Sequence, residues 1–438
     1  MKTFEELRLK HNAFNYDGYN IIKKGKEIEV IYQYSIDNLD SFTTKWSFPL
    51  SVNYDEKILD KLIFSLGLVE AISYYKITCP KIVNIKCGSL SKEKEKFWKK
   101  LFYNGLGEFM YKNNINIEEN ELLSFIYNSS NDTPTHDENS YKGIIIPVGG
   151  GKDSCVSLEL LKDENSATYC INPNETIKNI INRCDIKNNL SVKREFDSKM
   201  LEYNKQGYLN GHTPFSAIVA FSSFITAFLN GYKYIALSNE SSANETTVKG
   251  SFVNHQYSKS LEFENDFINY VKELCDSDIH YFSFLRPLKE IQIAYLFSRY
   301  EKYFDIFRSC NVGSKKGIWC CDCAKCLFVY IILSPFIKED KLINIFGKKV
   351  LDNLNLENDF RGIIGVNEVK PFECVGTRDE VVLSLSNYIK NNNSLLSDKY
   401  KEHFNSNEDV YDYVKSNFDL NNNVPSELLN KLKEALWK

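Results

Sequence analysis

The chain has 438 residues, 43% of them hydrophobic and 14% aromatic, which excludes a disordered protein and allows about two or three domains with a sizeable core. Its formal net charge of −4, without a basic block, argues against a nucleic-acid partner. The N-terminal sequence MKTFEELRLKHNAF carries acidic residues early and lacks an apolar core, so we expect no signal peptide.

Cysteine content and hydropathy indicate the compartment. Twelve cysteines without an export signal predict a reducing cytosol, where thiols stay free or bind metal. The charge-free stretch His212–Tyr232 has about the length of a membrane span, but Pro214 and several hydroxyl residues dilute it. We expect a buried core helix there and no membrane partner.

Residues 1–140 are predicted to form an N-terminal α+β domain. Short alternating segments such as IEVIYQYSI indicate strands, and Glu56–Tyr75 and Ser91–Tyr111 are predicted helices. The polar run Asn128–Ser140 has the composition of a linker.

Three consecutive glycines, Gly149–Gly151, lie a few residues after the polar run. Ile144–Val148 predicts a short buried strand before them, and the apolar positions after Asp153 predict a helix behind them. A glycine-rich turn between a strand and a helix presents unpaired N–H groups, which favour an anion such as phosphate. The alternative is a tight turn that binds no ligand.

The stretch GGGKDS resembles the PP-loop of the ATP pyrophosphatases, written SGGxDS, which grips the pyrophosphate end of ATP. Four residues match one for one: Gly150, Gly151, Asp153 and Ser154. Gly149 stands where that family has Ser, so one hydroxyl is missing. Lys152 adds a charge toward the phosphates, and Asp153 is the carboxylate expected to hold Mg²⁺. The resemblance implies that the substrate is adenylated and pyrophosphate is released.

Strands and helices alternate from here. The predicted strands are Gly143–Val148, Ala167–Ile171, Ser191–Glu195, Tyr234–Ser238 and His280–Phe284. Helices fill the gaps, including Pro214–Leu229, and the pattern predicts an α/β fold with a parallel sheet covered on both faces. Ligands of such sheets bind beyond the carboxyl ends of the strands. This PP-loop ATP-binding domain is expected to span 141–337, followed by a helical region, 338–438, whose last helix is capped by Ser426 and Glu427.

Three polar stretches outside the helices supply candidate site residues: NGHTPFSA (210–217), LSNESSANET (237–246) and VNHQYSKSLEFENDF (253–267). Imidazole titrates near neutral pH, so His255 is the first choice for proton transfer and His212 the second. Lys259 is a candidate for gripping a carboxylate, and Glu240 for holding Mg²⁺ or orienting a base. For each, the alternative is an ordinary hydrogen-bonded or solvated side chain.

Substrate recognition is predicted from amide and charged side chains. Arg286 offers a fork for a carboxylate or pyrophosphate, and Glu245 is a second carboxylate for metal or base. The amides suited to a peptide are Asn210, Asn239, Asn244 and Asn254. Solvated or helix-capping roles are again the alternative.

The stretch SCNVGSKKGIWCCDCAKC predicts a metal site. Four of its cysteines have the spacing C-x9-C-x2-C-x2-C: Cys310, Cys320, Cys323 and Cys326. Four thiolates so spaced can close a structural zinc site, leaving Cys321 spare. Reduced thiols without metal and an iron–sulfur cluster are the alternatives. The spacing resembles the zinc loop of 7-cyano-7-deazaguanine synthase, another PP-loop enzyme.

Together with PVGGGKDS, YFSFLRPLKEIQIA, WCCDCAKCLFV and PFECVGT, the polar stretches resemble one family, from about Gly143 to Thr377 and more loosely before it. It is the UDP-N-acetyl-muramoyl-L-alanyl-L-glutamate epimerase family of bacterial cell-wall synthesis. The resemblance implies a small nucleotide-peptide substrate and use of ATP and Mg²⁺. It further implies inversion of the terminal L-glutamate through an adenylated carboxylate, with AMP and pyrophosphate as products.

Other functions fit part of these motifs. One is an adenylating PP-loop ligase or nitrile synthase resembling 7-cyano-7-deazaguanine synthase. Another is a related peptide epimerase of a specialised pathway, and a third is a non-catalytic ATP-binding protein on the same fold. The sequence does not indicate an oligomeric state.

Overall fold

A computed structural model describes residues 2–129, 133–244, 254, 257–310, 312–404, 406 and 408–437. These residues form a mixed α/β protein that divides into two compact units. Unit 1 comprises Met1–Lys142, Leu190–Ile235 and Tyr257–Tyr281, and unit 2 comprises Gly143–Asn189, Ala236–Gln256 and Phe282–Lys438. The three domains expected from the sequence stay a prediction, and the two units divide the chain differently because unit 1 also takes up segments from its middle.

Six strands of unit 1 lie in the order β9-β3-β2-β1-β4-β5. Their bounds are β1 Ala13–Lys24, β2 Glu27–Ile36, β3 Asp40–Pro49, β4 Ile82–Leu90, β5 Ser124–Ser129 and β9 Asn188–Glu195. The pairs β1–β2, β2–β3 and β3–β9 are antiparallel, whereas β1–β4 and β4–β5 are parallel. The strand predicted at Ser191–Glu195 is therefore present, and it pairs antiparallel with β3, which is not one of the strands predicted to form the parallel sheet.

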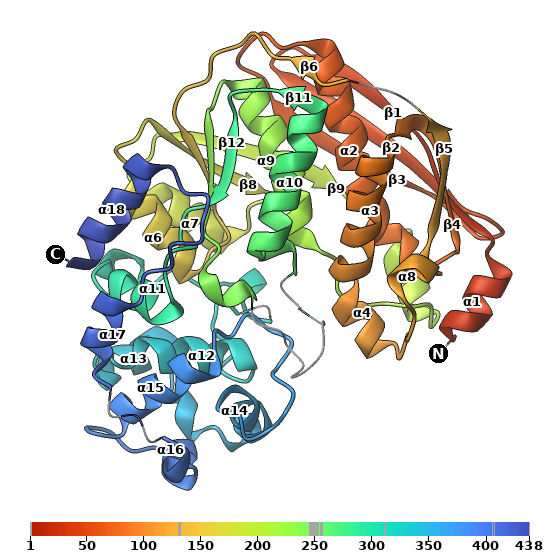
Figure 1. Ribbon diagram of the computed structural model, residues 1–438. Helices are drawn as coiled ribbons and strands as arrows, with labels where there is room; N and C mark the ends of the chain where they lie inside the picture. The colour runs from red at the N-terminus through yellow and green to blue at the C-terminus, as the bar shows by residue number, and fades with distance from the viewer. Residues whose placement is uncertain are drawn as a thin grey trace. The chain divides into compact units, whose positions relative to one another are not determined.

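The helices of unit 1 are α1 Phe4–Lys10, α2 Glu56–Tyr75, α3 Lys92–Gly105, α4 Gly107–Lys112, α5 Glu119–Leu122, α8 Lys199–Lys205, α9 Phe215–Asn230 and α10 Leu261–Leu274. Of these, α2, α3 and α9 pack against the sheet (Figure 1). The single helix predicted at Ser91–Tyr111 was wrong in one respect: it is broken at Leu106 between two glycines. Part of the predicted linker is strand β6 (Thr135–His136), which pairs with β11 (Cys275–Asp276).

The core of unit 1 is built from tyrosines whose hydroxyls reach the backbone of α2. Tyr32 Oη donates to Ile63 O at 2.9 Å, and Tyr34 Oη donates to Gly67 O at 2.8 Å. Both rings are fully buried, so these bonds satisfy hydroxyls that water cannot reach. A Cβ on Gly67 would lie 1.9 Å from Tyr16 Oη, which explains why glycine occupies this helical position.

Unit 2 contains the glycine-rich turn. Strand β7 (Ile144–Pro147) pairs in parallel with β8 (Ser166–Ile171), and helices α6 (Lys152–Leu161) and α7 (Glu175–Arg183) follow the two strands. Strands β10 (Tyr234–Leu237) and β12 (His280–Ser283) each begin in unit 1 and end in unit 2. The strands predicted in these regions are thus confirmed as elements, with bounds shifted by a residue or two.

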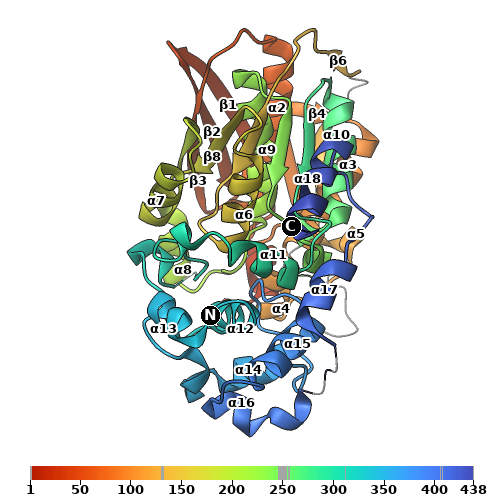
Figure 2. The same ribbon diagram turned by 90° about the vertical axis from the view of Figure 1, so that its left-hand side faces the viewer.

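The rest of unit 2 is helical, as predicted. Its helices are α11 Glu290–Phe297, α12 Ala324–Leu333, α13 Glu339–Phe346, α14 Glu357–Ile363, α15 Arg378–Tyr388, α16 Leu395–Lys399, α17 Val410–Ser416 and α18 Ser426–Trp437. Helix α12 is buried along its whole length, because α11, α13, α14 and α15 contact it (Figure 2). Across the described part of the chain, no helix has the length and apolar composition needed to span a bilayer.

Candidate functional site

The glycine-rich turn joins β7 to α6. The N–H of Val148 donates to Tyr169 O at 2.8 Å and so extends the parallel pairing up to the first glycine. Gly150 has φ +91°, a conformation that glycine adopts without strain. Gly151 is the N-cap residue of α6, and because glycine has no side chain, no side-chain hydrogen bond caps this end of the helix. The first N–H groups of α6 are therefore available to an anion.

A second segment, Arg308–Ser309, lies against this turn. The N–H of Arg308 donates to Gly150 O at 2.8 Å. A Cβ on Gly151 would lie 2.7 Å from Ser309 Oγ, so the serine hydroxyl is at the start of α6. Ser309 carries no signal in the sequence that links it to the glycines, because more than a hundred residues separate them.

Lys152 and Asp153, at the start of α6, form a buried ion network with Glu290. The Lys152 ammonium is 1% exposed and donates to Asp153 Oδ1 at 2.5 Å and to Glu290 Oε2. Glu290 is also 1% exposed and is the first residue of α11. The ammonium expected to face phosphate is thus held between two carboxylates, and its role toward a ligand stays a prediction.

Burial and charge shift both members of this pair. Burial raises the pKa of the Glu290 carboxyl to about 8, although Lys152 opposes the shift, and the charges of Asp153 and Glu240 add to it. Burial alone would lower the pKa of Lys152, but Asp153 and Glu290 raise it well above its usual value. Two carboxyl groups thus share one ammonium, and the raised pKa of Glu290 favours a proton on that carboxyl.

We expect Glu290→Gln to flatten the pH dependence of stability. Because folding raises the pKa of Glu290, the unfolded chain binds fewer protons between about pH 5 and 8, and the wild type loses stability as pH rises through that window. The loss is at most about 1.4 kcal/mol per pH unit. The midpoint of thermal unfolding at pH 6 and pH 8 should differ less in Glu290→Gln than in wild type. Glu301→Gln, whose side chain is 65% exposed, is the control and should keep the wild-type difference.

The segment after β10 is held by Arg286. This side chain is fully buried and donates to Glu240 O at 2.5 Å and to Ser283 Oγ at 3.3 Å. Asn239 Nδ2 donates to the same hydroxyl at 3.1 Å, and Glu240 accepts a hydrogen bond from Ser242 Oγ at 3.0 Å. Arg286 therefore holds the Asn239–Glu240 segment in place through these hydrogen bonds.

The motif PFECVGT lies beside Glu290. Lys370 Nζ donates to Gly376 O at 2.5 Å, and Lys325 Nζ donates to Cys374 O. A Cβ on Gly376 would lie 3.2 Å from Glu290 Cγ, so the motif passes close to the buried carboxyl. Glu290 lies within the stretch YFSFLRPLKEIQIA but is not among the site residues predicted from the sequence. Its only signal there is that it is the one carboxylate in the apolar stretch EIQIAYLF, where it is the first residue.

The remaining site candidates divide between the two units. His212, Lys259 and Asn210 lie in unit 1, whereas Glu240, Asn239, Arg286 and the glycine turn lie in unit 2. Asn254 also belongs to unit 2, and Lys259 ends the short 3₁₀ helix Tyr257–Lys259. His255, Glu245 and the side chain of Asn244 lie outside the described residues.

His212 pairs with a buried carboxylate. Its Nδ1 lies 3.3 Å from Glu108 Oε2, and the Glu108 side chain is 5% exposed. The carboxylates of three other His–carboxylate pairs in the described ranges are 45% to 70% exposed. Water screens a buried charge less than an exposed one, but the Glu108 carboxylate also pairs with Lys112 Nζ, so His212 and Lys112 share it.

The loop that carries His212 is fixed on both sides. Lys76 Nζ donates to Gly211 O and, at 2.7 Å, to Thr213 Oγ1, while Asn113 Nδ2 donates to Asn210 O at 3.0 Å. Burial lowers the pKa of Lys76 to about 8. The loop is thus held by side chains from distant positions in the sequence, and neither Lys76 nor Glu108 was a sequence candidate.

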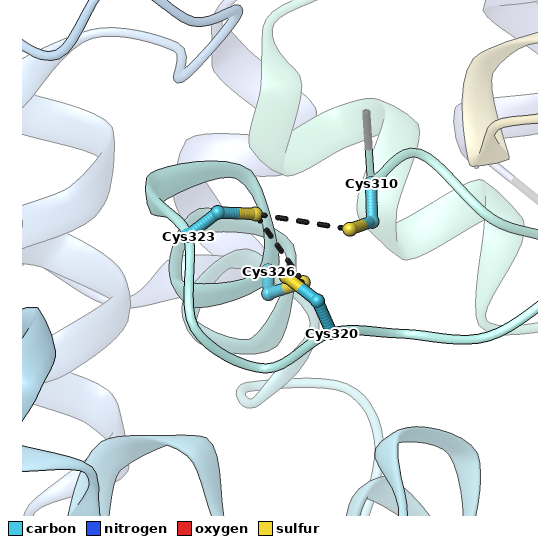
Figure 3. Close-up of side chains that lie close together, drawn as sticks. All are labelled: Cys310, Cys320, Cys323 and Cys326. Atoms are coloured by element: carbon cyan, nitrogen blue, oxygen red, sulfur yellow. Dashed lines mark hydrogen bonds between the residues drawn. The ribbon is translucent and has the colours of Figure 1, made fainter. Parts of the chain in front are cut away.

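The four predicted cysteines come together in unit 2 (Figure 3). Their Sγ atoms all lie within 4.8 Å of one another, with 3.8 Å between Cys310 and Cys323 and 3.6 Å between Cys320 and Cys326. A tetrahedral zinc ion with bonds of about 2.3 Å would place its sulfurs about 3.8 Å apart. The geometry therefore fits a four-thiolate metal site.

Backbone N–H groups support the same cluster. Gly313 N–H donates to Cys310 Sγ at 3.1 Å and Cys321 N–H donates to Cys326 Sγ at 3.3 Å, bonds that stabilise thiolates. The Cys321 side chain points elsewhere, toward Phe346 O at 3.2 Å. Its place outside the cluster agrees with the expected spare thiol.

Comparison with known proteins gives the family. Residues 5–284 match the model of the MurL N-terminal domain, and residues 306–406 match that of the MurL C-terminal domain. No solved structure gives a significant match to the chain.

Curated relatives cover most of the chain. A UDP-N-acetyl-alpha-D-muramoyl-L-alanyl-L-glutamate epimerase of a Micromonospora species is 32% identical over 87% of this chain and 88% of the relative. Proteins of the same name from Salinispora tropica and Xanthomonas oryzae pv. oryzae are 31% and 32% identical, over 87% and 71% of the chain and 86% and 70% of the relatives. The chain therefore belongs to the MurL family.

Proposed function

We propose that the protein is an ATP-dependent epimerase that inverts the terminal L-glutamate of UDP-N-acetylmuramoyl-L-alanyl-L-glutamate through an adenylated carboxylate. The observation that carries the ATP dependence is the glycine turn ahead of α6, with its capless helix start and adjoining Asp153. The substrate comes from the names of the relatives. On this proposal the glycine turn and its flanking strand and helix belong to a PP-loop ATP pyrophosphatase core.

The chemistry explains why an epimerase would use ATP. The α-proton beside a free carboxylate is very weakly acidic, because the carbanion would stand next to a negative charge. In the proposed first step a carboxylate oxygen attacks the α-phosphorus, the bond to the β-phosphate breaks, and pyrophosphate leaves. The resulting acyl-adenylate is uncharged at the carbonyl, which then accepts electron density from the α-carbon.

The remaining steps return the free acid. A base removes the α-proton, and a proton is delivered to the opposite face. Water then attacks the acyl carbon and displaces AMP. Alternatively, the neighbouring amide oxygen displaces AMP as it closes an oxazolone, and water opens that ring. One ATP and one water are consumed, and the products are the D-glutamate compound, AMP and pyrophosphate.

Residues at the start of α6 are assigned to ATP. The N–H groups after Gly149–Gly151 and the Ser154 hydroxyl suit the phosphates, since the positive end of the helix dipole favours them. Asp153, partly exposed beside the buried Lys152–Glu290 pair, is the side chain that would hold Mg²⁺. When bound, Mg²⁺ would neutralise charge on the departing pyrophosphate.

Inversion needs removal and return of the α-proton, and for this proton transfer His255 is the first candidate and His212 the second. The pairing of His212 with buried Glu108 supports the assignment of His212, since a carboxylate orients an imidazole and raises its basicity. Lys259 and Glu240 stay predicted to assist. The predicted substrate contacts are Arg286, Asn210, Asn239, Asn244, Glu245 and Asn254.

The cysteine cluster is assigned to structural Zn²⁺, which when bound would close the loop from Cys310 to Cys326. We expect about one zinc ion per chain. Cys323→Ser should lose the metal and lower the soluble yield by roughly threefold or more, because the ion would hold the loop. The specific activity of the protein that stays soluble should fall by a smaller factor than the yield. Cys321→Ser is the matched control and should keep its zinc. Metal-free protein with normal yield, measured by elemental analysis after purification without added metal, contradicts the assignment.

Incubation with ATP, Mg²⁺ and the L,L-dipeptide nucleotide tests the proposed function. AMP, pyrophosphate and the D-glutamate product should appear together. ADP and phosphate instead would contradict adenylation. AMP formation that depends on added ammonia or an amine would favour the ligase or nitrile synthase alternative, and ATP binding without any turnover would favour a non-catalytic protein.

A further inference from the structure

The glycine turn of this chain resembles the motif SGGxDS but lacks the hydroxyl of its serine. Gly149 stands at the serine position of SGGxDS, is exposed, and has open space where a Cβ would project. No steric reason within the described residues therefore excludes serine there. A phosphate site with one fewer hydroxyl would bind more weakly unless another group supplies it.

Ser309 supplies a hydroxyl to the same turn. Its Oγ lies 2.7 Å from the position that a Cβ on Gly151 would occupy, and the residue is half-buried, so it is accessible to a ligand. Among the described residues, no hydrogen bond engages this hydroxyl. Because Gly151 has no Cβ, the Ser309 hydroxyl can approach the start of α6 this closely.

The backbone of Ser309 is fixed from both directions. On one side Arg308 N–H bonds Gly150 O at 2.8 Å, and the Arg308 guanidinium donates through Nε to Gly317 O at 3.0 Å. On the other side Cys310 follows at once and belongs to the four-cysteine cluster. A side chain held between the glycine turn and the four-cysteine cluster loses little freedom when it binds.

We propose that Ser309 is a phosphate-contacting residue that replaces the hydroxyl missing at Gly149. The proposal rests on the proposed function, since the phosphate is that of ATP. The serine hydroxyl donates a hydrogen bond to a phosphate oxygen at the start of α6. The four-cysteine cluster sets its position through the adjacent Cys310.

The test exchanges the two hydroxyl positions. Ser309→Ala should raise the KM for ATP about tenfold and weaken calorimetric binding of Mg-ATP to the same extent, as expected for one hydrogen bond to a charged group. Its zinc content and thermal midpoint should match wild type. The double variant Gly149→Ser/Ser309→Ala should recover to within about threefold of wild type, because the restored serine reaches the same phosphates. Ser314→Ala, in the same loop, is the matched control.

Each outcome decides the question. An unchanged KM and affinity in Ser309→Ala overturns the proposal, as does a loss accompanied by loss of zinc or stability, which would mark a structural role. A double variant as weak as Ser309→Ala also overturns it. If wild-type protein itself binds no Mg-ATP, the proposed function has failed, and that result is separate from a failure confined to Ser309.

Discussion

Asp153→Asn should reduce ATP-dependent turnover by about two orders of magnitude or more while leaving the fold intact. The substitution removes the carboxylate assigned to Mg²⁺ but keeps its size, and Asp153 is 26% exposed and not packed in the core. Asn can still accept a hydrogen bond from Lys152, so the buried pair of Lys152 with Glu290 should remain. Initial rates of AMP and pyrophosphate release, with ATP and Mg²⁺ each varied, measure the effect.

Asp163→Asn is the control for this change. It makes the same substitution at an exposed position just beyond the other end of α6, and its turnover should equal that of wild type. Raised Mg²⁺ should partly restore Asp153→Asn if weakened metal binding is the cause. Wild-type rates in Asp153→Asn would show that the start of α6 does not serve ATP cleavage, and the PP-loop assignment would fall.

Local patterns predicted the elements of this fold well. Helix α2 occupies the predicted residues Glu56–Tyr75, and β7 lies within Ile144–Val148, because apolar periodicity and the flanking glycines are encoded in neighbouring residues. The cysteine cluster was predictable for the same reason, since its four members lie within one short stretch. The break at Leu106 was missed because it depends on Gly105, which meets the ring of Pro214 far along the chain.

Partners distant in sequence were not predictable from one chain. Lys152 and Glu290 are 138 residues apart, and nothing local identifies their ion pair. The pairing of β9 with β3, in which Trp46 faces Arg194, was likewise not predictable, since β3 lies far earlier in the chain. The candidate site therefore came from the sequence as motifs, and the groups that position those motifs, Glu108, Glu290 and Ser309, came from the structure.

Turnover in deuterium oxide should place solvent deuterium at the α-carbon of the terminal glutamate, and only when ATP is present. The proton must leave and return if the centre is inverted, and without activation the neighbouring carboxylate keeps it out of reach of a side-chain base. Mass spectrometry of substrate and product, together with their stereochemistry, measures the uptake. Uptake without ATP would contradict the adenylated intermediate.

Changing the proton-transfer residues should separate the two halves of this reaction. His212→Gln should lower deuterium uptake by roughly 10²- to 10⁴-fold while some AMP formation remains, because adenylation precedes deprotonation. Glu108→Gln should show the same separation to a smaller degree, since the imidazole stays but loses its charged partner. Asp276→Asn removes the carboxylate of the exposed His136 pair and should change neither rate.

Full uptake in His212→Gln would move the base to His255, for which His255→Gln is the corresponding variant. If wild-type protein forms AMP from the dipeptide nucleotide yet takes up no deuterium and yields no D-residue, the epimerase proposal fails, and an adenylating ligase becomes the better account of the glycine turn.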